Sequence, residues 1–303
     1  MTQPSKPRII AIVVTYQPVL AVLEQLLDAL ILQVDSVVMV DNGSHVDLQA
    51  WNNAHQTLHS IVLPLGDNKG IAAAHNAGIR FARESGAKFV LLMDQDSIPA
   101  PDMVERLVAA ATDWPSLAAA GPRYLDERRN NPPPFIRIRG LTLDRRACAA
   151  ADSIVHVDYL ISSGCLIPMS VLNKIGDMRD DLFIDYVDIE WGLRARRHGL
   201  QSYGVCSAHM KHSLGDHPLK FFNVSIPLHS PLRHYYHFRN AVLLYKEPWV
   251  PLNWKLVDGW RLFLKYGFYS LFATPRIAHW QMMTLGVWHG LTGKSGEFEG
   301  NAS

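Results

Sequence analysis

Residues 88–96, KFVLLMDQD, place five consecutive apolar side chains directly before an Asp-Gln-Asp sequence. A short apolar run that ends in polar residues is typical of a buried strand in an α/β sheet. Asp94 and Asp96 are two residues apart, so both carboxylates can project to one side of the strand end. Oxygen ligands of this kind suit Mg²⁺ or Mn²⁺, which fill their other positions with water and phosphate oxygens. We therefore predict a strand over 88–93 and a metal site that holds a nucleotide diphosphate.

Outward from this run, the first third of the chain alternates β-branched runs with helix-period segments. This alternation is typical of a parallel sheet covered by helices. We predict an α/β fold with a Rossmann-like, mostly parallel sheet and helices on both faces. The expected strands are 8–14, 36–40, 60–63 and 88–93, and the expected helices are 19–32, 47–58 and 70–84.

A polar cluster follows each of the four predicted strands. The clusters are Thr15-Tyr16, 41–44, 66–70 and 94–96. Asp, Asn and Gly often only reverse the chain after a strand, so any one cluster is explained as a turn. Because the carboxyl ends of parallel strands meet at one edge, four clusters in register predict a ligand site there.

Two residues of these clusters suit a nucleotide. Asp41 can accept a hydrogen bond from a base imide or a ribose hydroxyl, and Tyr16 offers a ring on which a base can stack. A helix cap at Asp41 or Ser44 is the structural alternative.

The later sequence continues the same domain. We expect strands at 154–161, 165–168 and 201–205, and helices at 170–175 and 186–198. Residues 121–146, with three consecutive prolines and seven arginines, are expected to form a mobile surface loop. We divide the chain into a nucleotide-sugar-binding half (1–115), a metal and acceptor half (116–247) and a C-terminal helical segment (248–303).

Three acids lie close together near the start of the helix at 186–198. Asp185, Asp188 and Glu190 create a like-charge density that costs stability unless cations or chemistry use it. The helix dipole and an i,i+4 pair of Glu190 with Arg194 account for two of the three. Asp188 remains as the candidate general base.

Further candidates lie between 206 and 240. His212 follows the strand that ends near Cys206 and is predicted to complete the metal shell. Arg233 and Arg239 lie on a predicted helix, where their guanidinium groups could bind a diphosphate.

The C-terminal segment is aromatic and basic. Five of the eight tryptophans follow Pro248, interspersed with Lys and Arg. Core helices docked on the main domain and a helix lying flat in a lipid interface are equally compatible with this composition.

Overall composition excludes several classes. A chain of 303 residues with a net charge of +1 is neither a disulfide-stapled miniprotein nor, by its charge balance, a nucleic-acid-binding protein. No stretch is long enough for a spanning helix. The three cysteines lack metal-binding spacing, so we expect reduced thiols and a cytoplasmic protein.

Taken together, these motifs resemble those of inverting family-2 glycosyltransferases with the GT-A fold, and among them bacterial rhamnosyltransferases. The resemblance covers residues 8–246 and rests on motifs that fall in the family's order: Val13–Tyr16, Val40–Ser44, Asn68–Ala72 with His75–Gly78, Leu92–Ser97, Ser162–Cys165, Leu182–Glu190, and Arg233–Tyr236 with Arg239-Asn240.

This resemblance implies that Thr15, Tyr16 and Asp41 hold the base and ribose, that Asp94 and Asp96 form the metal motif, and that Asp188 deprotonates the acceptor. Many members carry Glu-Asp where this chain has Val187-Asp188, so Asp185 is the reserve base. We extend the predicted nucleotide-sugar site, which also holds Asp94, Arg233 and Arg239, to Asn68, Gly70, Asn76, Gln95 and Tyr236.

The resemblance implies transfer of L-rhamnose from dTDP-β-L-rhamnose to a saccharide or lipid-linked acceptor, with a base, a metal ion and no enzyme nucleophile. A nucleotidyltransferase, or a scaffold that binds sugar nucleotides without turnover, are the alternatives. We expect a cytoplasmic protein in which residues 248–303 either pack on the core or contact the inner face of the cytoplasmic membrane.

Overall fold

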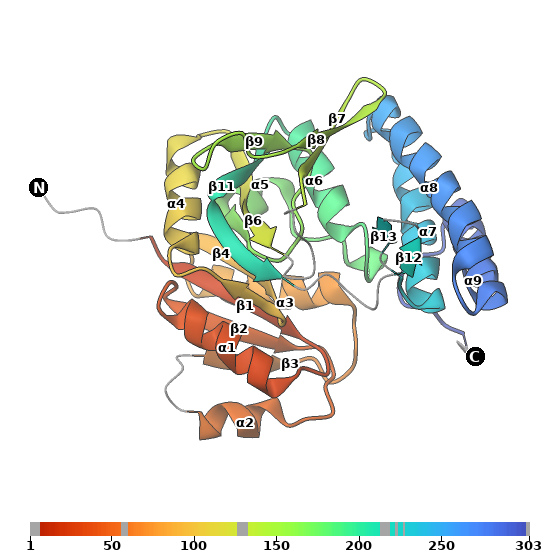
Figure 1. The fold of residues 1–303 in the computed structure, drawn as a ribbon. Coiled ribbons are helices and arrows are strands. Elements are labelled where there is room, and N and C mark those ends of the chain that lie inside the picture. Colours follow the sequence, from red (N-terminus) through yellow and green to blue (C-terminus); the bar gives the residue numbers. More distant parts are fainter. Residues whose placement is uncertain are drawn as a thin grey trace, which may run out of the picture.

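The computed structural model describes residues 7–55, 60–125, 133–212, 219–221, 224–226 and 228–300. Its centre is a nine-stranded mixed sheet, flanked by helices on both faces and by three C-terminal helices on one side (Figure 1). The strand order is β3-β2-β1-β4-β10-β6-β11-β5, and β9 pairs with β11.

Four parallel neighbours form the part of the sheet that the sequence predicts. They are β3 (Ser60–Pro64), β2 (Ser36–Asp41), β1 (Ile9–Thr15) and β4 (Phe89–Asp94). All four predicted strands are confirmed, with small shifts at their ends. In this register Val14 lies opposite Val40 on one side and Asp94 on the other. The polar residues that follow the strands therefore meet at one edge.

The remaining strands of the sheet come from the later sequence. They are β5 (Ser97–Pro99), β6 (Leu117–Leu125), β9 (Ile154–Val157), β10 (Cys165–Pro168) and β11 (Gln201–His212). Strand β10 is antiparallel to both β4 and β6, whereas β11 runs parallel to β6. One sheet therefore joins residues 1–115 and 116–247.

Alternate residues of the central strands face two separate hydrophobic cores. Ile10 and Ile12 of β1 pack under α3 (Ile71–Glu84), α5 (Met169–Ile175) and α6 (Val187–Arg197). Ala11 and Val13 face α1 (Leu20–Ile31) and α4 (Met103–Asp113). The apolar run of β1 is buried on both sides, as expected for a strand between two helical layers.

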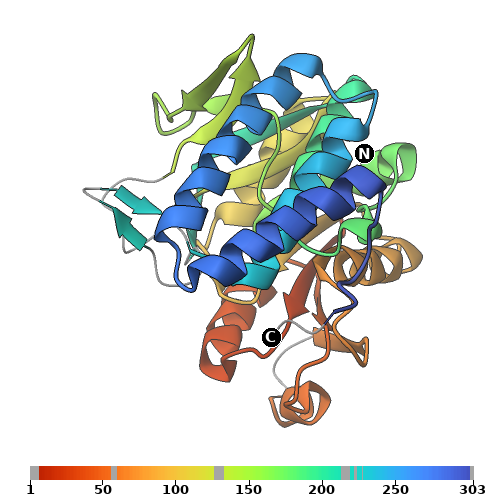
Figure 2. The same cartoon turned by 90° about the vertical axis from the view of Figure 1, so that its right-hand side faces the viewer.

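The C-terminal helices build a third core. Helices α7 (Pro231–Lys246), α8 (Leu252–Phe272) and α9 (Arg276–Thr292) bury Phe238, Trp254 and Met283 together with Tyr186 near α6. Figure 2 shows α8 and α9 side by side across the face that lies at the right in Figure 1. The expected C-terminal helical appendage is confirmed. Within the described residues, no helix has both the length and the apolar character that a membrane crossing needs.

The smaller elements are helix α2 (Leu48–Ala54), the 3₁₀ turn η1 (Asp180–Leu182), and the hairpins β7 (Phe135–Arg139) with β8 (Thr142–Arg146) and β12 (Leu219–Phe221) with β13 (Val224–Ile226). The end of the helix predicted over 47–58 lies outside the described residues.

Three expectations need correction. The expected loop at 121–146 contains the end of β6 and the β7–β8 hairpin, although 126–132 lie outside the described residues. Strand β9 ends at Val157, four residues before the predicted end, while β11 runs seven residues past Val205. Helix α4 is not among the predicted elements.

The expectation of three reduced cysteines is wrong for two of them. Cys148 and Cys206 form a disulfide with their Cα atoms 5.7 Å apart, and only Cys165 is free and buried. The pair is separated by 58 residues in sequence and is brought together by the fold rather than by a spacing motif.

Candidate active site

A cavity of about 480 Å³ opens at the carboxyl edge of the parallel strands. Residues from the ends of β1 and β4, the loops before α3 and α6, and the start of α7 line it. The predicted site residues in this lining are Tyr16, Asn68, Gly70, Asp94, Gln95, Asp96, Asp188 and Arg233. The fold thus gathers eight predicted residues that the sequence spreads over more than two hundred positions.

The ends of β1 and β4 are joined by one side chain. The Gln95 carboxamide accepts a hydrogen bond from the Tyr16 N–H (2.8 Å) and donates one to the Tyr16 carbonyl (3.0 Å). The Tyr16 side chain is left 48% exposed at the cavity. Its ring is therefore free to serve as a stacking surface while its backbone is fixed.

The Asp94–Asp96 turn is held from behind by buried hydroxyl groups. The Ser163 Oγ accepts a hydrogen bond from the Asp94 N–H (3.1 Å) and donates one to the Ser97 Oγ (2.7 Å). Asp94 is half-buried and Asp96 is exposed, and both line the cavity. The turn therefore presents two carboxylates to the cavity from a rigid base.

His212 lies near this turn in the backbone. In the β5–β11 pairing its Cα lies opposite Ser97, the residue after Asp96. Its side chain lies outside the described residues. Within the part of the chain that the structure describes, no cluster of three His, Cys, Asp or Glu side chains is arranged to hold a metal by itself.

Two asparagines shape the loop before α3. Asn42 donates from Nδ2 to the Asn68 Oδ1 (2.9 Å) and accepts at Oδ1 from the Lys69 N–H (2.8 Å). The Asn68 Oδ1 also accepts from the Gly70 N–H (3.0 Å). Gly70 has φ = +86°, and a Cβ there would come within 2.5 Å of the Phe183 carbonyl oxygen. The loop is thus packed directly against the segment that leads to Asp188.

Asp188 lies in the first turn of α6 and its carboxylate oxygen Oδ1 accepts a hydrogen bond from the Ile189 N–H (2.9 Å). Burial raises the pKa of the Asp188 carboxyl to about 7, and the negative charges of Asp185 and Asp94 add to the rise. A carboxylate with a pKa near neutrality is suited to accept a proton in catalysis.

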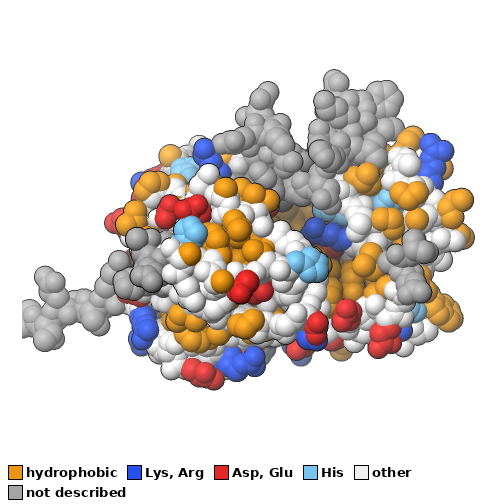
Figure 3. Space-filling view, turned by 90° about the horizontal axis from the view of Figure 1, so that it is seen from below, with side chains coloured by type: hydrophobic (Ala, Val, Ile, Leu, Met, Phe, Trp, Pro, Cys, Tyr) orange, Lys and Arg blue, Asp and Glu red, His pale blue; other side chains and the backbone are white. Residues whose placement is uncertain are grey.

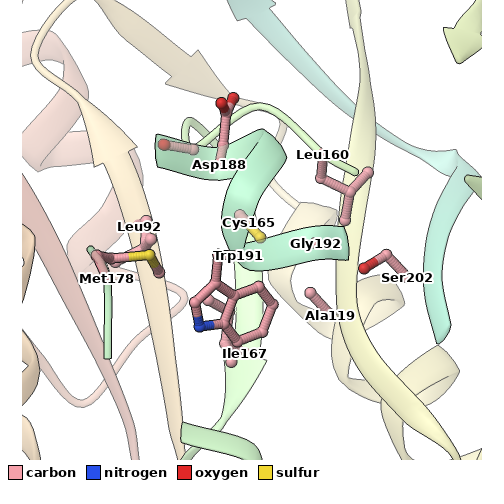
Figure 4. A pocket seen from close by; sticks show the side chains of 11 residues that line it. Leu92, Ala119, Leu160, Cys165, Ile167, Met178, Asp188, Trp191, Gly192 and Ser202 are labelled. Carbon is pink, nitrogen blue, oxygen red and sulfur yellow. The ribbon is translucent and has the colours of Figure 1, made fainter. Parts of the chain in front are cut away.

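The apolar surroundings of Asp188 explain this shift. A small cavity of about 10 Å³ lies under the residue, lined by Leu92, Cys165, Ile167 and Trp191 among others. Figure 4 shows the Asp188 carboxyl pointing away from these side chains. Asp188 therefore lies between an apolar floor, which disfavours its charged form, and the open cavity, where a substrate can reach it.

Two oppositely charged residues of the cavity lining form an ion pair. The Arg233 guanidinium donates to the Asp185 carboxylate over 3.3 and 3.4 Å, and both residues line the cavity. Glu190, the third acid, is buried and pairs with Arg194 (2.9 and 3.0 Å), as its spacing predicts. The structural role of Glu190 is thus confirmed.

Besides His212, five predicted residues lie outside the cavity lining. Thr15 is fully buried, and its hydroxyl lies 3.4 Å from both the Val40 carbonyl and the Asp41 Oδ1, which also accepts from the Ser44 N–H (3.2 Å). Asn76 bonds the backbone of Met178 through both ends of its amide (2.8 and 2.9 Å). Thr15 and Asp41 back the cavity edge, whereas Asn76 joins α3 to the chain before η1.

The other two lie on the inner side of α7. The Tyr236 hydroxyl accepts a hydrogen bond from the Phe298 N–H (2.8 Å), and its ring stacks on Phe183. Arg239 is fully buried and donates to carbonyl oxygens of 181–182 and of Gly296. Neither reaches the cavity directly, because the segment before α6 lies between them and it.

Several cavity residues lie outside the set that the sequence predicts. They are Asn42, Ser162, Phe183, Ile184, Val187 and His229, with Val14, Ile71 and Ile161. Asn42 directly follows β2 and was recognisable as part of a polar cluster. Phe183 and Ile184 carry no such signal, because their position depends on an unusual backbone rather than on their residue type.

The chain is similar to known proteins in both sequence and fold. A family model described as glycosyl transferase family 2 matches residues 10–175. A dTDP-rhamnosyl transferase, RfbF of Shigella flexneri, is 35% identical over 245 residues, which are 80% of this chain and 82% of that protein.

Solved structures share the fold at low sequence identity. TarS residues 1–349 from S. aureus, in complex with UDP-GlcNAc, matches 93% of this chain and 81% of its own with a TM-score of 0.60 and 18% identity. The mannosyltransferase PcManGT from Pyrobaculum calidifontis, with GDP-Man and Mn²⁺, matches 95% of this chain and 88% of its own with a TM-score of 0.56 and 16% identity. These likenesses confirm the predicted GT-A fold.

Proposed function

The chain belongs to glycosyl transferase family 2, and from this premise we propose that it transfers L-rhamnose from dTDP-L-rhamnose to an acceptor hydroxyl with inversion at the anomeric carbon. The proposed identity of the donor rests on the 35% identity, over 80% of the chain, to a protein named as a dTDP-rhamnosyl transferase. The apolar lining near Asp188, with Ile161, Ile184 and Val187, supports a 6-deoxysugar, whose C6 carries a methyl group in place of a hydroxymethyl group.

The nucleotide end of the donor is proposed to bind at the β1 and β3 edge. Tyr16 offers its exposed ring to the base. Asn68 and Gly70 line the same part of the cavity, and Asp41 with Thr15 supports it from behind. We propose that Asp41 exchanges its bond with the Ser44 N–H for one with the donor.

The donor set at the Asp94–Asp96 turn fits Mg²⁺ or Mn²⁺. Both side chains are oxygen ligands that line one cavity, and this is the chemistry that these hard ions prefer. Asp94 and Asp96 would hold the ion, and His212, whose backbone lies opposite Ser97, is the proposed third protein ligand. When bound, the ion would neutralise charge on the donor diphosphate.

Asp188 is the proposed general base. Its carboxylate takes the proton from the acceptor hydroxyl, and the acceptor oxygen forms a bond to the anomeric carbon. The bond from that carbon to the diphosphate oxygen breaks on the opposite face, releasing dTDP. Because one direct displacement inverts the centre, no enzyme nucleophile is needed. The apolar floor under Asp188 supports this role, because it favours the protonated product of the step.

Arg233 is the proposed partner of the leaving diphosphate. It lines the cavity and carries a positive charge beside Asp185. A charge-assisted bond from its guanidinium to a phosphate oxygen would stabilise the charge that develops as dTDP leaves. Arg239, which the sequence also suggests for the diphosphate, is not proposed to contact it, because its guanidinium donates to backbone carbonyls.

A donor panel tests the function. Purified protein is incubated with dTDP-rhamnose, dTDP-glucose, UDP-GlcNAc or GDP-mannose, with and without EDTA, and nucleoside diphosphate release is measured. We expect release only from dTDP-rhamnose, in the presence of a saccharide or glycolipid acceptor and of divalent metal. Release of pyrophosphate would indicate a nucleotidyltransferase instead. Binding without turnover of any donor would indicate a scaffold.

A membrane surface is the second proposed partner. Helix α8 exposes Leu256, Trp260 and Phe263 along one face, and α9 exposes Ile277, Trp280 and Trp288. Figure 3 shows hydrophobic side chains gathering at the right-hand end of the molecule, where these helices lie in Figure 1. Apolar stripes that include tryptophan are typical of helices lying in a lipid interface.

The charges of α8 and α9 indicate that the membrane bound by their exposed apolar faces is anionic. Between 252 and 292 the chain carries four basic residues and a single acid, Asp258. That acid faces inward, since Tyr186 and Tyr245 donate to it (2.8 and 2.6 Å). We therefore propose that the enzyme docks on the inner face of the cytoplasmic membrane, where a lipid-linked acceptor would be found.

We propose that three parts of the chain have separate roles in this function. Residues 1–115 bind the nucleotide sugar, 116–247 supply the base and the acceptor side, and 248–303 form the docking surface. The shared sheet makes the first two parts one structural unit.

A further inference from the structure

The segment that leads into α6 has an unusual backbone. Phe183, Asp185 and Tyr186 have φ values of +66°, +62° and +63°, in the left-handed region that non-glycine residues seldom adopt. Each such residue costs free energy and persists only where the surroundings fix it. All three lie within five residues of Asp188, so whatever fixes this segment also fixes the base.

A single buried amide contacts most of this backbone. The Asn240 Nδ2 donates to the carbonyl oxygens of Leu182 (2.8 Å), Ile184 (2.7 Å) and Asp185 (3.0 Å). Asn240 is fully buried on α7. The two N–H groups of one nitrogen thus serve three carbonyls, which converge on it in a segment where the chain passes through the left-handed region.

Arg239 fixes the orientation of that amide. Its Nε donates to the Asn240 Oδ1 (2.9 Å), so the amide oxygen is occupied and the nitrogen must face the carbonyls. The same guanidinium donates to the Leu182 carbonyl (3.0 Å) and lies over the Tyr236 ring at 4.9 Å. The arrangement satisfies a buried cation with carbonyls and an aromatic face.

Helix α7 contacts the segment at three points along one face. Arg233 bonds the Asp185 carboxylate, Tyr236 stacks on Phe183 at 4.9 Å, and Asn240 bonds the backbone. Spacings of three and four residues place these side chains on the same side of a helix. From the opposite side, Gly70 lies against the Phe183 carbonyl. The segment is therefore packed between α7 and the loop before α3 that contains Gly70.

We propose that Asn240 is a positioning residue for the transfer reaction: its amide holds the backbone of 182–185 in the one conformation that directs Asp188 into the cavity. This inference rests on the proposed function, in which Asp188 is the base. Asn240 itself does not line the cavity, so its effect passes entirely through the segment. At the nucleotide end, Tyr16 and Asn68 are held by hydrogen bonds with Gln95 and Asn42, and none of these bonds involves Asn240.

The test compares Asn240→Ala and the isosteric Asn240→Asp with Asn52→Ala. Asn52 is a matched control, because it is also a buried amide but bonds Ser60, on the far edge of the sheet. We expect kcat to fall about 10- to 100-fold in both Asn240 variants, within the range that a general base contributes. The dissociation constant for dTDP should stay within about threefold, and Asn52→Ala should keep the wild-type kcat.

Hydrogen exchange gives a second readout that needs no activity. Amides of 182–188 should exchange at least tenfold faster in both Asn240 variants, while those of β1 and β4 stay protected. A wild-type kcat, a parallel loss of kcat and dTDP binding, or unchanged exchange at 182–188 would overturn the inference. Failure of both variants to fold would also reject it, since the amide would then be a general stability element. If the wild type transfers no sugar, the proposed function fails, while exchange still decides whether Asn240 fixes the segment.

Discussion

Gln95 and Tyr16 are 79 residues apart in sequence, yet the Gln95 side chain bonds both the N–H and the carbonyl of Tyr16. This reciprocal pair joins the predicted base-binding end of β1 to the predicted metal-binding end of β4. The backbone pairing of the two strands ends at Val14 and Asp94, so the Gln95 side chain links the residues that follow it.

Replacement of Gln95 by alanine is expected to weaken dTDP binding about tenfold, because two hydrogen bonds that order Tyr16 are lost, at about 1 kcal/mol or less each. Isothermal titration calorimetry measures the effect. The control is Gln49→Ala, because Gln49 is an exposed residue of α2 that bonds its helix neighbour Asn53. Equal affinities in the two variants would show that Gln95 does not organise the nucleotide site.

Asp188→Asn is expected to lower kcat by about 10²- to 10⁴-fold, the usual contribution of a general base, with dTDP affinity unchanged. Asp185→Asn is the comparison, because that acid lines the same cavity but pairs with Arg233. Asp185→Asn should reduce kcat less. A reversed order of the two variants would move the role of base to Asp185.

The pH dependence of kcat/KM follows from the raised pKa of Asp188, which is about 7. The base acts in its ionised form, so kcat/KM should rise with pH and level off above about pH 7 to 8. A profile measured with dTDP-rhamnose between pH 5 and 9 checks this. A rate that is flat across that range would exclude Asp188 as the titrating base.

The same shift predicts a stability difference. A carboxyl whose pKa is raised on folding binds its proton more tightly in the folded state, so its stabilising contribution is lost as pH rises toward 7. The variant Asp188→Asn has no carboxyl at this position, so its stability does not fall with pH for this reason. As the pH rises from 5.5 to 8.5, the free energy of unfolding of the variant should increase relative to that of the wild type by roughly 1–2 kcal/mol. The expected change is kept small because Asp188 is only half-buried. Urea unfolding at the two pH values would contradict this if the gain were absent.

Docking on a bilayer should depend on the exposed face of α8. The double variant Trp260→Ser with Phe263→Ser is expected to reduce co-sedimentation with anionic liposomes at least fivefold, because two of the largest exposed apolar side chains are removed. Leu32→Ser is the control, since Leu32 is 87% exposed after α1. Unchanged partitioning would reject the bilayer, and concentration-dependent dimers lost in the double variant would identify a second copy as the occupant.

The sequence predicts the N-terminal half of the fold well for a physical reason. Strands β1 and β4 are buried on both faces, so they appear as uninterrupted apolar runs, and their ends are marked by polar residues. The hairpin of β7 and β8 was missed because arginines alternate with apolar residues in Phe135–Arg139, a pattern that we interpreted as a charged loop.

Asp94, Asp96 and Asp188, which the sequence singles out by their residue type and position, line one cavity, and their chemical roles stay predictions. Arg239 was placed at the diphosphate because a buried arginine bonded to carbonyls cannot be distinguished in sequence from one that binds phosphate. Its carbonyl partners, Asp181, Leu182 and Gly296, lie 57 or 58 residues away in sequence. Such contacts arise only from the tertiary fold.

The disulfide between Cys148 and Cys206 was missed for the same reason. In guanidinium without reductant, the protein is expected to titrate one thiol, that of Cys165, and three after reduction. Three reactive thiols without reductant would show that the bridge does not form in the purified protein.

The contact between Gly70 and the Phe183 carbonyl leaves no room for any side chain at position 70. Relatives in which the segment before the proposed base packs against this loop in the same way must therefore keep glycine at position 70, whatever sugar or acceptor they use. Position 70 becomes a diagnostic marker: a chain of this fold with another residue in its place must have moved the segment ahead of its base, and its catalytic geometry should be solved anew.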